Sequence, residues 1–257
     1  MIRVGVLGAA GRVGGELCRT VAAHPGLVLA AAIDPSHAGV MVGDVEVAGS
    51  LDALREASVD VAVDFTTPTA VMDNVRWCIA HGVHAVVGTT GIPAGGLDEV
   101  RTLAESAGAH VLVCPNFAIG AVLMMRFAEH AARFLPAAEI VELHRDGKAD
   151  APSGTAIATA RRIAAARGPG VAASPGGDDA HPGARGADVD GIRVHAVRLP
   201  GLLAHQEVIL GGPGQTLTIR HDSTDRSSFM PGVLLAIERI ASLPGLTVGI
   251  ESLLEDA

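Results

Sequence analysis

A histidine, an arginine and a lysine stand within five residues at the start of the segment HRDGKADAPSGTA, which covers residues 144–156. The imidazole of a histidine titrates near neutral pH, so His144 is suited to moving a proton during a reaction. Lys148 follows four residues later. Asp150-Ala-Pro then predicts a turn, because a proline cannot continue a strand. We interpret the segment as an acid–base group beside a cluster of positive charge.

The Ser-Gly-Thr sequence that follows predicts the start of a helix. Ser153 is a residue type that caps helices, and the backbone N–H groups of Gly154 and Thr155 would point outward, able to receive a carboxylate. Arg145 and Lys148 would add charge-assisted hydrogen bonds. Together these features predict a site for a small polyanion. The alternative is a solvated surface loop of charged residues, against which the helix start and a separate nucleotide motif both weigh.

That nucleotide motif is GAAGRVG at residues 8–14, which follows a strand-like segment and opens a predicted helix. Glycines allow a tight turn and a close approach to a pyrophosphate, and the helix N-terminus offers free N–H groups. Asp34 lies 20 residues past Gly14, where an acid accepts hydrogen bonds from an adenosine ribose. The spacing is GxxGxxG rather than GxGxxG. The alternative is a strand–helix turn that binds nothing.

The residues around Asp34 bear on the choice between two nicotinamide cofactors. A carboxylate repels the 2′-phosphate of NADPH, and the next residue, Pro35, supplies no cation. Arg12 would compensate only in part. We therefore expect NADH to be preferred and NADPH to be tolerated.

Two later loops are expected at the same edge of the sheet. Gly88-Thr89-Thr90-Gly91 and Cys114-Pro115-Asn116-Phe117 each end a predicted strand. Ligands of open parallel sheets bind beyond the carboxyl ends of the strands, so these loops are candidates to line a nicotinamide pocket. Ordinary turns at strand ends are the alternative.

Short apolar segments alternate with helical patterns through about residue 118, which predicts a parallel sheet covered on both faces. The predicted strands are residues 2–7, 27–34, 59–65, 84–88 and 110–115, and the predicted helices are residues 11–23, 68–81 and 97–107.

The pattern then changes, and a second domain with a mixed sheet is expected because several strands follow one another without helices. The expected elements are helices at 121–134, 154–167 and 229–242, strands at 138–144, 193–199, 204–210 and 216–221, and a long loop at 168–191. The last helix is expected to return to the first domain. The expected boundaries are residues 1–118 with 228–257 for the first domain, and residues 119–227 for the second.

Composition narrows the classes of function. The chain has 257 residues, enough for one large or two modest domains, and a formal net charge of −9, which argues against nucleic-acid or acidic-membrane partners. No apolar run reaches the length of a membrane span. Three scattered cysteines without a CxxC pair indicate neither disulfides nor zinc and fit a reducing cytoplasm. The histidines lack metal-site spacing, so no metal is expected.

The segment ELHRDGKADAPSGTA, at residues 142–156, resembles the signature of the 4-hydroxy-tetrahydrodipicolinate reductase family, E-hydrophobic-H-H-x-x-K-x-D-A-P-S-G-T-A. The resemblance runs through the whole chain. Its other motifs are GAAGRVG at 8–14, DFTTP at 64–68, VVGTTG at 86–91, PNFAIG at 115–120 and VHAVRLPGLLAHQEV at 194–208.

The resemblance implies an α/β fold, in which a Rossmann-like parallel-sheet domain is completed by the C-terminal helix and joined to a smaller α+β domain with a mixed, largely open sheet. It implies NAD(P)H-dependent reduction of a cyclic imine dicarboxylate to tetrahydrodipicolinate, by a homotetramer assembled through the smaller domain. His144 and Lys148 match the catalytic residues, and Gly154 and Thr155 match the substrate-carboxylate loop. The residues that match cofactor contacts are Gly8, Ala9, Ala10, Gly11, Arg12, Val13, Asp34, Gly88, Thr89, Thr90, Cys114, Pro115, Asn116 and Phe117.

One position departs from the family pattern. Arg145 stands where the family has a second, substrate-binding histidine. An arginine can hold a carboxylate bidentately, but it stays charged and cannot transfer protons at neutral pH. Two further readings are therefore kept, namely a reductase of a related cyclic imine or keto acid and a non-catalytic NAD-binding sensor. The presence of both His144 and Lys148 argues against the sensor.

Overall fold

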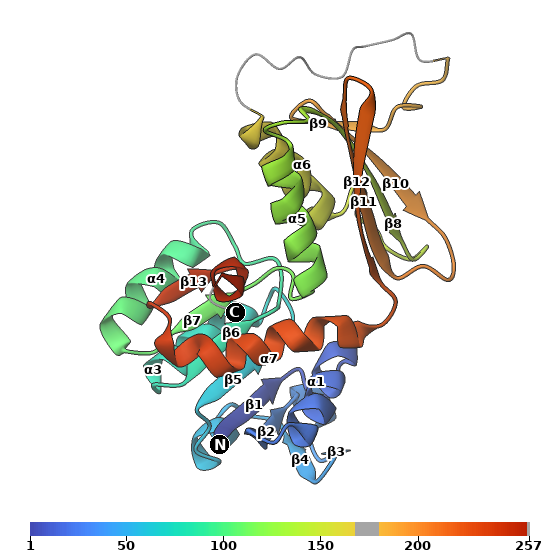
Figure 1. Cartoon of the computed structure of the whole chain (residues 1–257). Coiled ribbons are helices and arrows are strands. Elements are labelled where there is room, and N and C mark those ends of the chain that lie inside the picture. The colour runs from blue at the N-terminus through green and yellow to red at the C-terminus, as the bar shows by residue number, and fades with distance from the viewer. Residues whose placement is uncertain (168–179, 256–257) are drawn as a thin grey trace. The chain divides into compact units, whose positions relative to one another are not determined.

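The computed structural model describes residues 1–167 and 180–255. The chain divides into two compact units. Unit 1 comprises Met1–Phe117 and Phe229–Ala257, and unit 2 comprises Ala118–Ser228. Figure 1 shows the elements of both units.

Unit 1 is built on an eight-stranded sheet in the order β13-β7-β6-β5-β1-β2-β4-β3. All neighbouring strands are parallel except β3 and β4, which form an antiparallel pair at one edge. The strands are β1 (Ile2–Leu7), β2 (Leu27–Ile33), β3 (Met41–Val42), β4 (Val45–Ala48), β5 (Val61–Asp64), β6 (His84–Val87), β7 (Val111–Val113) and β13 (Leu246–Val248). The order reverses direction at β1, which is the place where open α/β sheets bind ligands.

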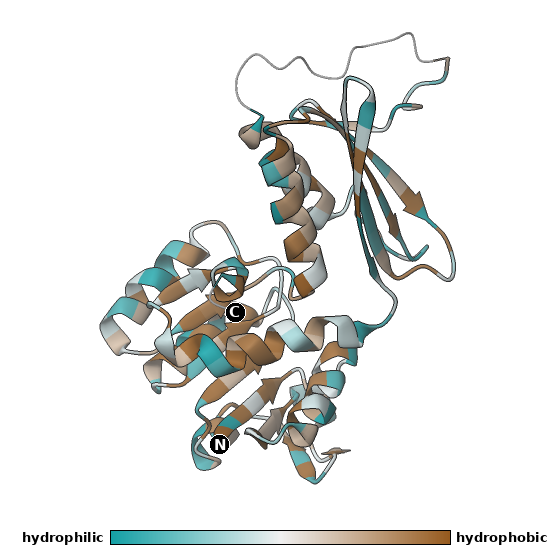
Figure 2. Ribbon diagram, in the orientation of Figure 1, coloured by the Kyte–Doolittle hydropathy of each residue, from teal (hydrophilic) through white to brown (hydrophobic). Residues whose placement is uncertain are grey.

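Helices cover both faces of this sheet, so its central strands are apolar on both sides. The helices are α1 (Arg12–Ala23), α2 (Asp52–Glu56), α3 (Val71–Ala80), α4 (Gly96–Ala107) and α7 (Met230–Arg239). Residues of α2, α3 and α4 share one core with Leu7, Ile33 and Val87 of the strands, whereas α7 contacts α1 and β6. Figure 2 shows the hydrophobic colour of these strands.

The C-terminal helix returns to unit 1, and a glycine explains how closely it packs. A Cβ added at Gly232 of α7 would lie 2.1 Å from the carbonyl oxygen of Phe117. Only glycine allows this approach of the helix to the loop after β7. The chain then continues through a 3-10 helix, Ile240–Ser242, to β13 at the sheet edge.

Unit 2 is a five-stranded mixed sheet in the order β12-β11-β8-β10-β9, of which only the β8–β10 pair is parallel. Its elements are α5 (Ile119–Ala131), β8 (Ala137–His144), α6 (Gly154–Ala166), β9 (Ala187–Val189), β10 (Ile192–Arg198), β11 (Ala204–Gly212) and β12 (Gln215–Ser223). Helices α5 and α6 pack against one face of the sheet and against each other. Inward residues such as Ile140, Val194 and Val208 are fully buried there.

The predicted fold class is confirmed by these two sheets. The long loop expected at 168–191 is wrong in part, because it contains β9; residues 168–179 of it lie outside the described residues. The sequence analysis also left out β3, β4 and β13. All four are edge or near-edge strands of two to four residues, too short to show an apolar alternation.

Two negative findings apply to the described residues alone. None of the helices is long and apolar enough to cross a membrane. No group of three or more His, Cys, Asp or Glu side chains is placed to hold a metal ion.

Candidate active site

The central strand β8 of unit 2 carries Glu142 and His144 on the same face, because side chains two residues apart in a strand point the same way. This is the face packed against α6. Glu142 is completely buried, and the side chain of His144 is 16% exposed. The strand therefore ends with a buried carboxylate beneath a histidine that reaches the surface of unit 2.

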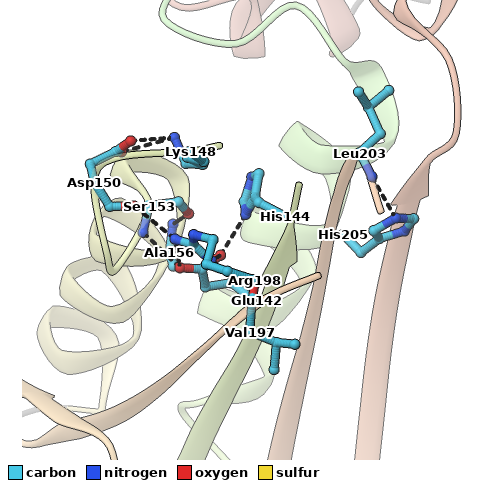
Figure 3. Close-up of polar contacts among 10 residues, drawn as sticks. All are labelled: Glu142, His144, Lys148, Asp150, Ser153, Ala156, Val197, Arg198, Leu203 and His205. Atoms are coloured by element: carbon cyan, nitrogen blue, oxygen red, sulfur yellow. Dashed lines mark hydrogen bonds and ion pairs between the residues drawn. The ribbon is translucent and has the colours of Figure 1, made fainter. Parts of the chain in front are cut away.

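The carboxylate of Glu142 orients the imidazole of His144. Nδ1 of His144 lies 2.5 Å from Oε2 of Glu142. Figure 3 marks this contact with a dashed line. Because an ionised carboxylate only accepts hydrogen bonds, Nδ1 is the nitrogen that carries the hydrogen. In the neutral ring, Nε2 then holds the lone pair and is the atom able to exchange a proton with a substrate.

An arginine from the neighbouring strand completes this arrangement. Arg198 ends β10 and pairs in register with His144 of β8. Its NH1 and NH2 atoms donate to Oε2 and Oε1 of Glu142 at 2.9 and 2.7 Å, which makes a bidentate ion pair. NH2 also donates to the carbonyl oxygen of Asp150 at 2.7 Å. The guanidinium thus joins strand β8 to the loop before α6.

The charges around His144 set its protonation. Burial is the main reason that the pKa of His144 lies below its ordinary value. The hydrogen bond and the charge of Glu142 oppose this lowering, and the positive charges of Lys148 and Arg198 add to it to a smaller extent. Burial alone would raise the pKa of Glu142, but the hydrogen bonds from Arg198 and His144 bring that pKa below its ordinary value. At neutral pH the site therefore holds a neutral imidazole and an ionised carboxylate.

Lys148 is held by a carboxylate in the same loop. Its Nζ lies 2.7 and 2.9 Å from the two carboxylate oxygens of Asp150. The hydrogen bond from Lys148 lowers the pKa of Asp150. Asp150 is largely exposed, whereas Lys148 is 24% exposed. An exposed ion pair of this kind is weak, so a substrate carboxylate can compete for the ammonium group.

Helix α6 begins as predicted, with Ser153 as its cap. The Ser153 hydroxyl accepts from the amide of Ala156 at 3.2 Å. The Ser153 amide donates to Oε1 of Glu142 at 3.0 Å. The amides of Gly154 and Thr155 follow, and a Cβ added at Gly154 would meet nothing within 4 Å. The first turn of α6 is therefore open at the position predicted for a substrate carboxylate.

Arg145 is exposed, and its guanidinium lies over Gly147, where an added Cβ would come within 2.9 Å of NH1. The sequence analysis assigned no role to Glu142 or Arg198. The spacing of Glu142 and His144 along one strand was a usable signal for the first. Arg198 had none, because its contact depends on the pairing of strands that lie 56 residues apart.

In unit 1, the predicted glycine turn has the close contacts that a nucleotide cradle needs. Gly8 has a φ of 77°, and a Cβ there would lie 2.5 Å from the carbonyl oxygen of Phe65. A Cβ at Gly14 would lie 2.1 Å from the carbonyl oxygen of Gly8. The first turn of α1, capped by Gly11, is thereby brought close to the end of β1. This backbone fits a pyrophosphate at a helix N-terminus.

A cavity of about 490 Å³ adjoins this turn. Gly8, Gly11, Asp34 and Pro35 line it together with residues to which the sequence analysis assigned no role, namely Leu7, Ile33, Ser36, His37, Gly49, Leu51, Phe65, Thr66, Thr67, Ala70 and Asn74. Oδ1 of Asp34 accepts from the Ser36 amide at 3.1 Å and lies 3.1 Å from Nδ1 of His37. A second cavity shares Gly11 and His37 and is lined by Ala9, Ala10 and Arg12. Val13 lines neither.

A buried aspartate holds the loop after β6 by hydrogen bonds. Asp64, at the end of β5, accepts from the hydroxyl of Thr89 at 2.6 Å and from the side chain of Asn74 at 2.7 Å. The Thr89 hydroxyl thus points toward Asp64 inside the unit, and Thr90 is exposed. A Cβ at Gly88 would overlap the ring of Phe65 at 2.1 Å.

The loop after β7 lies beside the same aromatic ring. Phe117 is buried and makes an edge contact with Phe65, with 6.1 Å between ring centroids. The thiol of Cys114 donates to the carbonyl oxygen of Asn116 at 3.0 Å, and burial raises its pKa to about 12. Cys114 is therefore a buried neutral thiol, and Pro115 and Asn116 continue the loop. All the predicted cofactor residues follow the carboxyl ends of strands in the same parallel sheet.

Comparison with known proteins gives two family matches that together cover nearly the whole chain. Residues 2–117 match the family described as dihydrodipicolinate reductase, N-terminus. Residues 120–254 match dihydrodipicolinate reductase, C-terminus. The division between the two matches falls close to the first division between the structural units.

Curated relatives and solved structures agree with these matches. The 4-hydroxy-tetrahydrodipicolinate reductase of Nocardia farcinica is 55% identical over 99% of both chains. That of Mycolicibacterium vanbaalenii is 54% identical over 99% of both chains. A dipicolinate-bound dihydrodipicolinate reductase from Paenisporosarcina sp. TG-14 is 42% identical, with a TM-score of 0.89 over 98% of this chain and 99% of that one.

A more distant structure shares the fold alone. An amine dehydrogenase from Mycobacterium smegmatis is 15% identical, with a TM-score of 0.64 over 96% of this chain and 94% of that one. The full-length matches at higher identity settle the family. The chain belongs to the dihydrodipicolinate reductase family, the NAD(P)H-dependent oxidoreductases that reduce 4-hydroxy-tetrahydrodipicolinate in diaminopimelate and lysine biosynthesis.

Proposed function

We propose that unit 1 binds NADH in preference to NADPH, and that unit 2 binds the dicarboxylate substrate, with His144 and Lys148 as catalytic residues. The observation that carries this proposal is the contact between Nδ1 of His144 and the buried carboxylate of Glu142. The same carboxylate accepts from the amide of Ser153 at the start of α6. It fixes the tautomer of a histidine beside a helix N-terminus that is open to an anion.

His144 acts as the acid–base group through Nε2. In the free protein its lowered pKa keeps the ring neutral. A bound dianion would oppose the effect of Lys148 and Arg198, because a nearby negative charge favours the protonated ring. Substrate binding would thus load His144 with the proton that it donates during the reduction.

The substrate carboxylates are held by groups at the end of β8 and the start of α6. The amides of Gly154 and Thr155 receive one carboxylate at the helix N-terminus. Lys148 exchanges its partner Asp150 for the substrate. Arg145, which is exposed over Gly147, swings to a second carboxylate and can hold it bidentately. The cluster of positive charge thus serves a dianion.

The cofactor preference follows from the groups around Asp34. Its Oδ1 already accepts from the Ser36 amide, and the cavity beside it suits the adenosine ribose. The carboxylate is compatible with the 2′-hydroxyl of NADH and repels the 2′-phosphate of NADPH. Arg12 lines the adjoining cavity and supplies a positive charge that lets NADPH be tolerated. When bound, the nicotinamide supplies the hydride.

A coupled assay tests the proposal. Aspartate semialdehyde and pyruvate are supplied with the preceding synthase, and nucleotide oxidation is followed at 340 nm with NADH and then with NADPH. We expect turnover with both and a higher kcat/KM with NADH. A higher kcat/KM with NADPH would contradict the assignment of Asp34, and absence of turnover above background would contradict the substrate.

The same proposal includes a homotetramer in the cytoplasm. The sheet face of unit 2 opposite α5 and α6 carries Val141, Leu143 and Ile209 among ion-paired residues such as Glu139 and His195. We expect light scattering to give the mass of four chains, and Ile209→Asp to lower it. A monomeric parent protein would contradict the assembly. The three cysteines are buried and free, as a reducing compartment allows.

A further inference from the structure

We propose that Glu142 and Arg198 are positioning residues whose buried ion pair holds the ring of His144 and the first turn of α6 in one fixed arrangement. The inference rests on the proposed role of His144 and extends it to two residues that act through His144 and the start of α6. In this inference the carboxylate of Glu142 orients two groups, namely the ring of His144 and the first turn of α6.

The hydrogen bonds of Glu142 are saturated. A carboxylate offers about four acceptor positions, and four donors occupy them. Oε2 accepts from His144 Nδ1 and from NH1 of Arg198, and Oε1 accepts from the Ser153 amide and from NH2 of Arg198. Figure 3 shows the donors converging on the carboxylate from β8, β10 and the start of α6. A residue with fewer acceptors would release at least one of them.

Arg198 adds a third fixed point to the loop between His144 and Ser153. Its NH2 donates to the carbonyl oxygen of Asp150 at 2.7 Å, and the side chain of the same residue pairs with Lys148. The loop that carries Arg145 and Lys148 is therefore held at its beginning, near its end and at its last residue. The separation of the histidine ring from the helix N-terminus is fixed by side chains rather than by the loop itself.

Stability alone is a poor explanation for this pair. Burying two charges costs desolvation energy that their attraction repays only in part, and well-packed apolar residues of similar volume are often as stable or more so. Nε of Arg198 is, in addition, a buried donor without a hydrogen-bond partner among the described residues. Such a group carries a cost of its own. The geometry that the pair imposes on His144 is a benefit that apolar residues would not supply.

The charged groups facing His144 come from three directions. Glu142 lies on the same strand, Arg198 on β10, and Lys148 in the loop. The other elements packed here contribute neutral groups: the Ser153 amide at the start of α6, and Gln206 of β11 beside Glu142. Of these, only Glu142 raises the pKa of His144. Loss of its charge should therefore lower that pKa further.

The same two strands provide a matched control. Glu139 of β8 contacts Nε2 of His195 on β10 at 2.8 Å, on the opposite face of the sheet. Both side chains are partly exposed, so this pair has the same chemistry without the burial or the helix contact. Glu139→Gln therefore reports what loss of a Glu–His contact does to the fold alone.

The test compares Glu142→Gln, Glu142→Asp and Glu139→Gln in the full chain. Glutamine has one oxygen and one amide group, so it cannot accept from all four donors. For Glu142→Gln we expect kcat to fall on the order of 100-fold, as for loss of general acid–base catalysis, with the KM for NADH unchanged. NMR of His144 in the free protein should show a lower pKa and a mixture of tautomers. Glu142→Asp should recover part of kcat, and Glu139→Gln should leave the pKa and the tautomer of His144 unchanged.

Parent-like kcat and parent-like His144 signals in Glu142→Gln would overturn the inference. If Glu142→Gln fails to fold, Arg198→Lys decides the question, because it keeps the charge but loses the bidentate fork. We expect about a 10-fold loss of kcat there with an altered His144 tautomer ratio, and unaltered values would overturn the inference. If His144→Ala retains full turnover, the proposed function fails. The His144 NMR signals of the parent chain and of Glu142→Gln still show whether Glu142 positions the ring.

Discussion

The two candidate sites differ in what builds them. In unit 1 the nucleotide cradle is made of backbone, because Gly8 and Gly14 remove side chains where the chain must come close to itself. In unit 2 the proposed substrate site is made of side chains, because Glu142 contacts both His144 and Arg198. A site made of backbone tolerates few substitutions at its glycines. The geometry of a site made of side chains depends on several residues, each of which contributes a contact.

This difference predicts which substitutions should disturb each site. A cradle of backbone depends on the absence of Cβ atoms where the chain approaches itself. A network of buried side chains depends on the charge and hydrogen-bonding capacity of each member. Substitutions in unit 2 should therefore act on turnover and on its pH dependence, and substitutions in the cradle should act on nucleotide affinity.

The largest expected effect is on turnover. His144→Ala and Lys148→Ala should each lower kcat by about 10²- to 10⁴-fold, the range for loss of a proton-transfer group. NADH affinity, measured by fluorescence titration, should remain nearly that of the parent chain. His195→Ala is the control, since His195 lies on the opposite face of the same sheet. Equal loss of turnover and of NADH affinity would show that these residues are structural.

A smaller effect is expected on nucleotide binding when a side chain enters the cradle. Gly8→Ala places a Cβ 2.5 Å from the carbonyl oxygen of Phe65 in a left-handed conformation. Backbone strain of about 1–3 kcal/mol corresponds to roughly a 5- to 150-fold loss of NADH affinity, measured by calorimetry. Gly82→Ala is the matched control, because Gly82 also has a positive φ but has open space around it. Parent-like NADH affinity in Gly8→Ala would contradict the cradle.

The same contrast explains how much the sequence predicted. The turn after β1 and the helix start at Ser153 were predicted from local spacing, because glycine geometry and helix capping are properties of short segments. The fold class was predicted from strand and helix periodicity, which is strongest in long central elements. The edge strands β9 and β13 were missed because three residues carry no period.

The side-chain partners were the least predictable part. Arg198 meets Glu142 only because β10 pairs with β8, and Asp64 meets Thr89 only because β5 pairs with β6. Both carboxylates lie in motifs that resembled the family, but the motif alone assigned them no function. Long-range pairing decides such contacts, and one sequence does not encode it in any local pattern.

A third effect is expected in the pH profile of unit 2. Burial, Lys148 and Arg198 place the pKa of free His144 below its ordinary value of 6.5. If the protonated ring donates, kcat/KM should fall about tenfold for each pH unit above that lowered pKa, because kcat/KM reports the free enzyme. The dianionic substrate should raise the pKa in the complex, so the corresponding limb of kcat should lie at higher pH. Coincident limbs would contradict the charge coupling.

The lowered pKa of His144 should also make folding stability depend on pH. A histidine whose folded pKa lies below its unfolded value contributes stability above about pH 6.5, and this stability is lost as the pH falls toward the folded pKa. Glu142, whose pKa is also lowered, contributes stability above its unfolded value that is lost at still lower pH. The melting temperature should therefore fall on acidification, and less so below pH 6.5 in a His144→Asn variant. An unchanged slope in that variant would contradict the lowered pKa.

The smallest effect is expected at the exposed Arg145, where the motif given in the sequence analysis has a histidine. Arg145→His places that histidine in this chain. Because Lys148 and the start of α6 would still hold the substrate, we expect kcat to stay within about twofold and the substrate KM to change less than tenfold. Arg145→Ala should raise that KM by roughly 10-fold, since a charge-assisted hydrogen bond contributes about 1.5–3 kcal/mol.

The direction of the Arg145→His effect decides what the arginine does. A modest rise in KM would mean that Arg145 binds the family's substrate as well as the histidine does, by a bidentate contact in place of an imidazole. A 100-fold gain in kcat/KM would mean that the pocket favours another dianion, which a panel of cyclic imines and keto acids would then identify. Steady-state kinetics on the coupled substrate, with NADH affinity as the invariant control in unit 1, separate these outcomes. The arginine is exposed and lies outside the Glu142 network, so its replacement should leave the His144 signals unchanged, and any change in KM then belongs to substrate recognition alone.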